Sequence, residues 1–258
     1  MNEATPFLIA GGLSLLLGGI LVYHYFRAKQ LLDEMWAVDT YTARELRQMC
    51  SSDFNATVEV EGKVSCDKPI TSLVSEIPCC WCRTRVERQQ ERVRTTKTGI
   101  QTENVWVNAM DSTRVAVFKV TDETGYTLVD PTNSEIDSEK PHVIIASQRE
   151  QWFEGVGFSD TGDYRITEEM FLPTGYAYIL GQASACQEGT SPDVLIHYPE
   201  AGYMNPGKRF FIISRKHEKE LAKSQETIVK VCFWTSILAL ISVAFCAWTL
   251  FGVIHWSP

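Results

Sequence analysis

The sequence has few basic residues for its length, and this shortage limits what the protein can bind. It has 24 Lys and Arg against 32 Asp and Glu, which gives a formal net charge of -8. A chain of that charge has no general affinity for nucleic acid or anionic lipid. Glycine and proline, with 16 and 10 residues, are near average usage, so collagen-like and low-complexity chains are excluded. A charged fraction of 22% is too high for a protein built mainly of membrane spans.

Short catalytic motifs are also missing from the sequence. It contains no G-x-x-x-x-G-K phosphate loop, no G-x-S-x-G nucleophile elbow and no H-E-x-x-H zinc helix. We therefore expect no catalytic residue, no metal and no cofactor, and a protein that is not an enzyme.

Thiols are concentrated at Cys79, Cys80 and Cys82, with Cys66 upstream. Zinc sites require paired C-x-x-C units or histidine partners at set spacings, and neither occurs here. On a strand, Cys80 and Cys82 would lie on one face and Cys79 on the other, which suits packing better than tetrahedral ligation. We interpret the thiols as buried packing residues, and a metal or redox site stays open as the alternative.

Two segments contain neither acidic residues nor Lys or Arg. Residues 7–26 read FLIAGGLSLLLGGILVYHYF, and residues 231–256 read VCFWTSILALISVAFCAWTLFGVIHW. Each reaches the roughly 20 residues that a helix needs to cross the hydrocarbon core. The first has no basic residue before it and ends in aromatics, which disfavours a cleaved signal peptide. The sequence therefore predicts two transmembrane helices.

Basic residues flank these segments only on their inner sides. No Lys or Arg precedes Phe7 or follows Trp256, whereas Arg27 follows the first segment closely and Lys230 precedes the second. The positive-inside rule then predicts a multi-pass protein of the inner (plasma) membrane, with both termini outside. The middle of the chain would be cytoplasmic, where its cysteines stay reduced.

The middle of the chain is predicted to be mainly β. After an extracytoplasmic N-terminus (1–6), residues 27–56 have the spacing of a helical connector, and residues 57–213 alternate with a period of two in short runs. A helical interruption is predicted at Thr167–Met170, and Ser214 is a suitable N-cap for a juxtamembrane helix over residues 214–230. The predicted fold class is a membrane-anchored protein with two transmembrane helices flanking a barrel-like or sandwich-like, mainly β (α+β) domain.

One basic cluster stands out in this acidic chain. It comprises Arg83, Arg85, Arg88, Arg92, Arg94 and Lys97. Alternation places Arg83 and Arg85 on one face of a strand, and the run continues into a predicted hairpin that turns near Thr98 and Gly99. Arginine forks bind phosphates, so the cluster is a candidate site for a nucleotide or oligonucleotide. A solvated hairpin, partly neutralised by Glu87 and Glu91, is the alternative.

The second apolar segment carries a stripe of small or weakly polar residues at helical spacing. It comprises Thr235, Ala239, Ser242, Cys246 and Thr249. Small residues allow close helix contact in a membrane, and Gly11, Ser14 and Gly18 offer a matching set on the first segment. Two interpretations stay open. The stripe packs against the first span or another copy, or it lines a central pore in a homo-oligomer.

Four segments together resemble the GIDE family, whose "beside-a-membrane" (BAM) domain lies between two transmembrane helices. They are VEVEGKV (58–64), CWCRTRVE (80–87), RITEEMFLPTGYAYILGQA (165–183) and RFFIISRKHEKELAKS (209–224). Eukaryotic members continue after the second span into a RING finger and are ubiquitin ligases. This sequence stops at Pro258 without one, so it resembles a prokaryotic-type member that lacks the RING, and the resemblance does not carry ligase activity over.

The resemblance implies further expectations about function. BAM-domain proteins without a RING resemble components of prokaryotic conflict systems, including anti-phage defence, in which a partner enzyme makes a nucleotide signal. We therefore expect a homo-oligomeric sensor or effector in the lipid bilayer that detects such a ligand or its partner enzyme and gates a pore or disrupts the membrane. A non-catalytic scaffold or adaptor related to the GIDE ligases is the alternative.

Overall fold

A computed structural model describes residues 5–51, 54–96, 99–137, 142–146, 163–186, 193–199 and 210–256. The chain divides into two compact units. The helical unit contains the two ends of the chain, up to Asp39 and from Glu218, and the β unit is Thr40–His217. Two long apolar helices therefore flank a mostly β domain, and the predicted fold class is confirmed.

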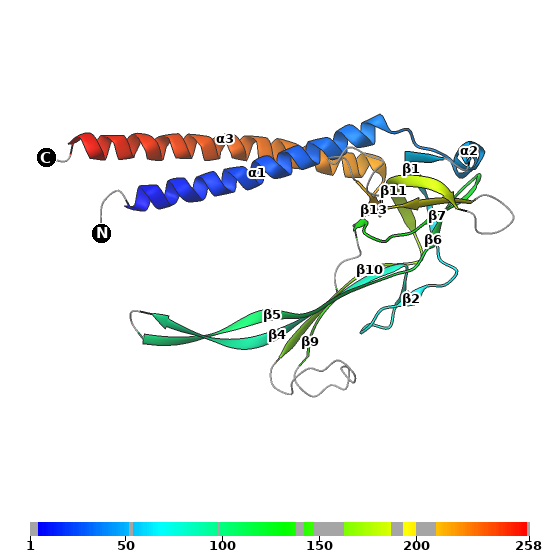
Figure 1. Ribbon diagram of the computed structural model, residues 1–258, viewed down its shortest axis with the longest axis horizontal. Helices are drawn as coiled ribbons and strands as arrows, with labels where there is room; N and C mark the ends of the chain where they lie inside the picture. Colours follow the sequence, from blue (N-terminus) through cyan, green and yellow to red (C-terminus); the bar gives the residue numbers. More distant parts are fainter. Residues whose placement is uncertain are drawn as a thin grey trace. The chain divides into compact units, whose positions relative to one another are not determined.

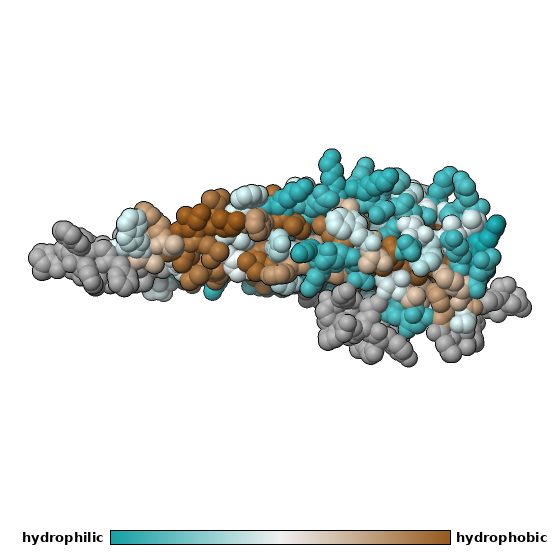
Figure 2. Space-filling model, turned by 90° about the horizontal axis from the view of Figure 1, so that it is seen from above, coloured by the Kyte–Doolittle hydropathy of each residue, from teal (hydrophilic) through white to brown (hydrophobic). Residues whose placement is uncertain are grey.

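The helical unit consists of α1 (Thr5–Ala37) and α3 (Glu218–Trp256), which contact each other along their lengths. Both are long and apolar enough to cross a membrane, within Ile9–Ala37 and Glu218–Thr249. Apolar side chains cover much of this unit (Figure 2). The chain is a membrane protein with two candidate spans. Neither helix contains a breaker between its charged and apolar parts, so α3 runs about 58 Å at 1.5 Å per residue.

A short helix, α2 (Ala43–Met49), opens the β unit. Thr42 and Glu45 form a capping box, in which the backbone N–H of each residue donates to the side chain of the other, at 2.8 Å from Thr42 and 3.3 Å from Glu45. The Ala43 N–H donates to Asp122 at 2.7 Å. Ala43 and Leu46, three residues apart on one face of α2, are buried, and Leu46 is part of the core of the β unit.

Five strands of the β unit close into a barrel. They are β1 (Asn55–Ser65), β6 (Phe118–Asp122), β7 (Gly125–Val129), β12 (Asp193–His197) and β11 (Tyr176–Cys186), in that order around the ring, with β11 pairing back onto β1. The succession β11-β1-β6-β7 is that of a Greek key. Among the five described barrel strands, β7 and β12 form the one parallel pair. Two short strands, β13 (Ile212–Ser214) and β8 (Glu135–Ile136), extend the sheet beyond β11.

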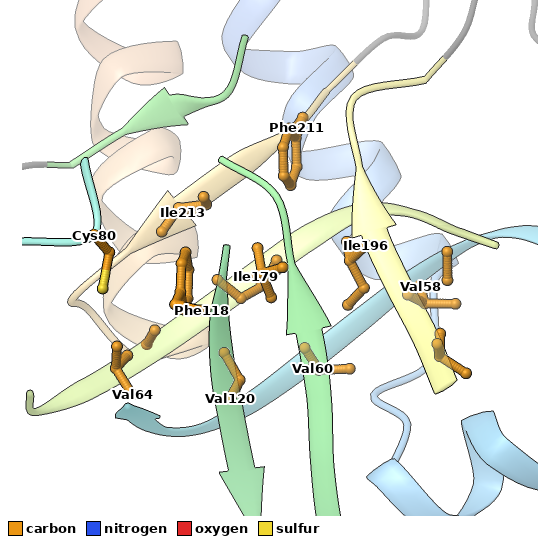
Figure 3. Close-up of a cluster of buried hydrophobic side chains, with 14 of the residues drawn as sticks. Val58, Val60, Val64, Cys80, Phe118, Val120, Ile179, Ile196, Phe211 and Ile213 are labelled. Atoms are coloured by element: carbon orange, nitrogen blue, oxygen red, sulfur yellow. The ribbon is translucent and has the colours of Figure 1, made fainter. Parts of the chain in front are cut away.

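The barrel interior is filled by alternate side chains of its strands. Val58, Val60, Phe118 and Ile179 are at most 3% exposed and converge on one interior (Figure 3). Gly181 is required by this packing, since a Cβ there would lie 2.6 Å from Phe211 Cδ2 and 2.8 Å from Ile196 Cγ2.

A second sheet is inserted between β1 and β6, and between β7 and β11, of the barrel. It has the order β5-β4-β10-β9, built from β4 (Trp81–Thr96), β5 (Gly99–Val115), β10 (Tyr164–Phe171) and β9 (His142–Ala146). The small hairpin of β2 (Ile70–Thr71) and β3 (Pro78–Cys79) precedes β4. The second sheet is attached to the barrel because Trp81 of β4 and Phe171 of β10 are buried in the barrel core. The β4–β5 hairpin that the sequence predicted is confirmed (Figure 1).

Two local predictions are wrong. Thr167–Met170 is not helical but lies within β10. There Ile166, Glu168 and Met170 are buried, whereas Arg165, Thr167 and Glu169 between them are only partly buried. Ser214 does not cap a helix, because it ends β13, and α3 begins at Glu218. The Ser214 hydroxyl instead donates to Asp137 at 3.1 Å.

Candidate functional site

The β4–β5 hairpin carries the described residues of the basic cluster. β10 pairs with β4 only from Trp81 to Arg88, whereas β5 pairs with β4 along its whole length. The Gln89 N–H donates to the Asp163 carbonyl just before β10, at 2.9 Å. Among the described residues, the part of β4 from Gln90 to Thr96 is paired with β5 alone and extends about 23 Å at 3.3 Å per residue. The hairpin has a sheet-supported half and a two-stranded distal half (Figure 1).

Arg83 and Arg85 lie in the sheet-supported half. They are two residues apart on β4 and therefore lie on the same face of the strand, as predicted. Arg83 donates to both carboxylate oxygens of Asp111 on β5, at 2.9 and 2.7 Å, and Arg85 Nε lies 3.7 Å from the same carboxylate. The hydrogen bond from Arg83 and the charges of both arginines lower the pKa of Asp111. Asp111 therefore stays ionised at neutral pH. It compensates part of the positive charge of Arg83 and Arg85, which would otherwise attract a phosphate.

Arg88 ends the sheet-supported half, opposite Val107 of β5 and Tyr164 of β10. Its neighbour Glu87 does neutralise an arginine, as the alternative interpretation proposed, but the partner is Arg165 of β10 at 2.6 Å. The Arg165 guanidinium also lies over the Trp106 ring, 5.0 Å from its centroid.

Arg92 and Arg94 lie in the distal half and are exposed. Arg94 is 3.9 Å from Glu103, a long contact between side chains that are 66% and 45% exposed. Val93 and Ile100 beside them are also exposed, at 63% and 75%. Lys97 lies outside the described residues. The structure thus divides the predicted cluster into a pair held by Asp111 and a more exposed pair near the turn.

The stripe on α3 lies partly against α1. A Cβ on Gly18 would be 3.6 Å from the Ala239 Cβ, and one on Gly11 would be 3.7 Å from the Cys246 Cβ. Between them, the hydroxyls of Ser14 and Ser242 are 3.2 Å apart.

The two threonines of the stripe bond within α3. Thr235 donates to the Val231 carbonyl at 2.6 Å, and Thr249 donates to the Phe245 carbonyl at 3.1 Å. Within one chain, the contacts of Ala239, Ser242 and Cys246 favour pairing of the two spans.

The thiols separate into two environments. Cys79 and Cys82 pack with Met170 under the second sheet, whereas Cys80 belongs to the barrel core with Cys66 at its margin. The predicted alternation is wrong because Cys80 lies in a bend between β3 and β4. Burial raises the pKa of Cys80, and a hydrogen bond from Cys79 lowers the pKa of Cys82 to about 7. Among the described residues, no three His, Cys, Asp or Glu side chains are grouped to hold a metal.

A polar cluster that the sequence analysis missed lies on the outer face of β1 and β11. This junction cluster comprises Thr40, Glu59, Glu61, Tyr176, Tyr178 and His217. Glu59 is 1% exposed and accepts hydrogen bonds from Thr40 at 2.6 Å and Tyr178 at 2.8 Å. The Tyr41 N–H also donates to the Glu59 carbonyl at 2.8 Å. These bonds attach the segment that follows α1 to β1.

The C-terminal side of the junction cluster is centred on Glu61. Tyr176 donates a hydrogen bond to its carboxylate, and His217 Nδ1 lies 4.0 Å away. Burial and the hydrogen bond to Glu61 raise the pKa of Tyr176. The Tyr176 and His217 rings lie 4.1 Å apart. Since His217 directly precedes α3, both chain segments that lead to the membrane helices contact one strand of the barrel. The sequence does contain a signal for this cluster. In VEVE (58–61), the two glutamates alternate with valines, which places both carboxylates on the face of β1 opposite the valines.

Comparison with known families gives a match that covers well over half of the chain. A model of the GIDE family, described as E3 ubiquitin ligase, matches residues 84–247. No curated protein and no solved structure matches the chain. After Cys186 the given sequence contains only two cysteines, Cys232 and Cys246, both within α3. The zinc ligands of a RING finger are therefore not found after the second helix in these 258 residues.

Proposed function

This chain belongs to the GIDE family, and from that membership we propose that it is a membrane-anchored recognition protein. Its two helices form the anchor, and its β unit captures a phosphate-bearing signal or the enzyme that makes it. The observation that carries the proposal is the distal half of the β4–β5 hairpin. Among the described strands, none other than β4 and β5 pairs with this half, and it exposes Arg92 and Arg94.

The ligand class follows from the distribution of charge along the hairpin. Asp111 already offers Arg83 and Arg85 a carboxylate, so a phosphate there must displace a two-point ion pair. Of the two distal arginines, Arg94 forms a long ion pair with Glu103, at 3.9 Å between exposed side chains, which a phosphate displaces more easily. A nucleotide or short oligonucleotide fits this small basic region better than a long nucleic acid, which the net charge of -8 would repel.

The junction cluster supports a route from this domain to the membrane. Thr40 and His217 end the two segments that lead to α1 and α3, and they contact neighbouring carboxylates of one strand. A displacement of β1 relative to β11 would act on both segments together. We propose that ligand capture is passed to the helices here, with the β unit in the cytoplasm and both termini outside.

Binding to the hairpin is tested with fluorescently labelled cyclic and linear oligonucleotides and the full chain in nanodiscs. Arg92→Ala/Arg94→Ala should weaken binding at least tenfold, because each lost phosphate contact removes an ion pair and its counterion release. Arg83→Ala/Arg85→Ala is the matched control and should weaken binding less, since Asp111 already occupies that pair. Equal losses in both variants, or unchanged binding in the first, would reject the distal half as the site.

A pore is the second candidate for the output. In a homo-oligomer, Thr235, Ala239, Ser242, Cys246 and Thr249 would line it only if α3 exchanged its contacts with α1 for contacts with other copies. The contacts within the chain support a paired anchor more directly. A non-catalytic adaptor related to the GIDE ligases, which would only tether partners, needs the membrane anchor but neither the pore nor the arginine hairpin.

A further inference from the structure

Strand β5 is an exposed edge of the second sheet. It is 17 residues long and pairs with β4 on one side, and it ends the strand order β5-β4-β10-β9 (Figure 1). None of its residues is fully buried. An edge of this kind presents unpaired backbone N–H and C=O groups to any strand that approaches.

The sequence of β5 has few of the features that protect edge strands from pairing. Gly99–Val115 contains no proline and no lysine, and its only charged residues are Glu103, Asp111 and Arg114. One bulge interrupts the strand, because Val86 pairs with Met110 and Glu87 with Asn108, which leaves Ala109 without an opposite residue. Asp111 is held by Arg83, so Glu103 and Arg114 are the charges available at the two ends of this edge.

The bulge places Glu103 and Arg114 on the same face of the sheet. Residues separated by an odd number in a regular strand point to opposite faces. Here Glu103 pairs with Arg92 and Arg114 pairs with Cys82, and these two partners are an even number of residues apart on the unbulged β4. A same-face acid at one end and a base at the other make the edge complementary to an antiparallel copy of itself.

We propose that two copies of this chain join through antiparallel pairing of β5 with β5 about a two-fold axis perpendicular to the sheet. Glu103 of each copy then lies opposite Arg114 of the other, so the ion pair forms twice. This register also places Asn104 of one copy opposite Thr113 of the other. Their own β4 partners, Glu91 for Asn104 and Arg83 for Thr113, are an even number of residues apart, so Asn104 and Thr113 lie on the same face of the sheet. Parallel pairing in register would instead set like charges against each other.

A second copy is the occupant that the structure favours. Copies anchored in one membrane by the same helices share one side of the bilayer, so their β5 edges meet at raised local concentration. Arg114 donates from Nη1 to the Thr71 carbonyl at 2.9 Å, which uses one of the five N–H donors of its guanidinium. Glu103 remains 45% exposed beside Arg94.

Disulfide trapping in liposomes tests the register with the full chain. Asn104→Cys/Thr113→Cys should give a covalent dimer on mild oxidation, because opposite residues of antiparallel strands have the Cα separation that a disulfide requires. Both positions are exposed, so the substitutions spare the core. Asn104→Cys alone, whose cysteine would face Thr113, is the matched control and should give little dimer.

Charge reversal tests the ion pairs independently, measured as dimer dissociation in detergent by sedimentation. Glu103→Arg and Arg114→Glu should each weaken the dimer roughly tenfold, since two attractive pairs become repulsive. The combination Glu103→Arg/Arg114→Glu should restore it, which a folding defect would not do. The proposal would be overturned if Asn104→Cys/Thr113→Cys gave no cross-link in membranes. It would also be overturned if both single charge reversals weakened the dimer and the double reversal did not restore it. A dimer indifferent to all three charge variants would assign the contact to the helices instead.

Discussion

At the scale of single residues, one buried carboxylate determines how β10 and the β2–β3 hairpin fit together. Glu168 is 0% exposed, and it accepts hydrogen bonds from the Val74 and Ser75 N–H groups, both at 2.9 Å. The hydroxyls of Ser75 and Thr84 donate to it at 2.6 and 3.1 Å. Burial raises the pKa of Glu168, but these donors outweigh burial and lower it overall. The carboxylate is therefore ionised and structural.

Glu168→Gln should lower the free energy of unfolding by about 2 kcal/mol. Its amide NH₂ would take the place of one carboxylate oxygen that now accepts hydrogen bonds, and the donors facing it would lose their acceptor. Glu169→Gln, on the outer face of the same strand, is the control and should change stability little. Because the folded pKa of Glu168 lies below its unfolded value, its contribution is complete above the unfolded pKa. The contribution is lost as pH falls through the folded pKa. Thermal unfolding from pH 7 to pH 3 should therefore show a smaller acid loss in the Gln variant; an identical acid profile would contradict this assignment.

At the scale of elements, α1 and α3 meet through small residues rather than large ones. Gly18 faces Ala239 and Ser14 faces Ser242, which lets the two backbones approach closely. In a bilayer, close van der Waals contact and weak interhelical hydrogen bonds replace the hydrophobic effect as the source of helix pairing. We therefore expect the contact between α1 and α3 to be sensitive to side-chain volume on the face of α1 that carries Ser14 and Gly18.

Ser14→Cys/Ser242→Cys should form a disulfide within one chain, since the native hydroxyls are 3.2 Å apart. Adding Gly18→Leu should reduce its yield several-fold in membranes, because the new side chain meets Ala239. Adding Gly19→Leu should not, since a Cβ at Gly19 has nothing within 4 Å. If the cysteines do not link and Ser242→Leu, but not Ile241→Leu, blocks ion flux in liposomes, α3 lines a pore and the pairing model is wrong.

At the scale of the whole molecule, the chain order of the two units constrains topology. The helical unit is made of the two ends of the chain and the β unit of its middle, so two spans place both termini on one side of the membrane. The basic residues adjoining the apolar segments belong to the chain between them. The positive-inside rule therefore predicts a cytoplasmic β unit.

A reporter fused after Pro258 should behave as extracytoplasmic, and one inserted in the β unit should behave as cytoplasmic. Alkaline phosphatase activity and green fluorescence in the same host distinguish the two sides. The reverse pattern would show that the charge count is misleading and would place the proposed ligand site outside the cytoplasm.

The sequence by itself determined the two apolar helices, the mainly β middle and the long hairpin. These features rest on local patterns, namely uncharged runs of span length and a period of two between turns. The β4–β5 hairpin also follows from a local pattern, because its two strands are adjacent in the chain. The family resemblance rested on four motifs, in residues 58–64, 80–87, 165–183 and 209–224, which are recognised from the order of residues alone.

Only the tertiary structure decided the remaining features, because their partners are distant in sequence. Thr167–Met170 has the composition of a helix, yet Glu168 is fixed in a strand by donors 93 and 94 residues away. Barrel closure depends on β1 pairing with β11, and the positive charge of Arg83 and Arg85 is partly compensated by Asp111 across the hairpin. The junction cluster likewise joins Glu61 to Tyr176, 115 residues later. Periodicity along the chain reports which side of a strand is buried, but it does not report which strand covers it.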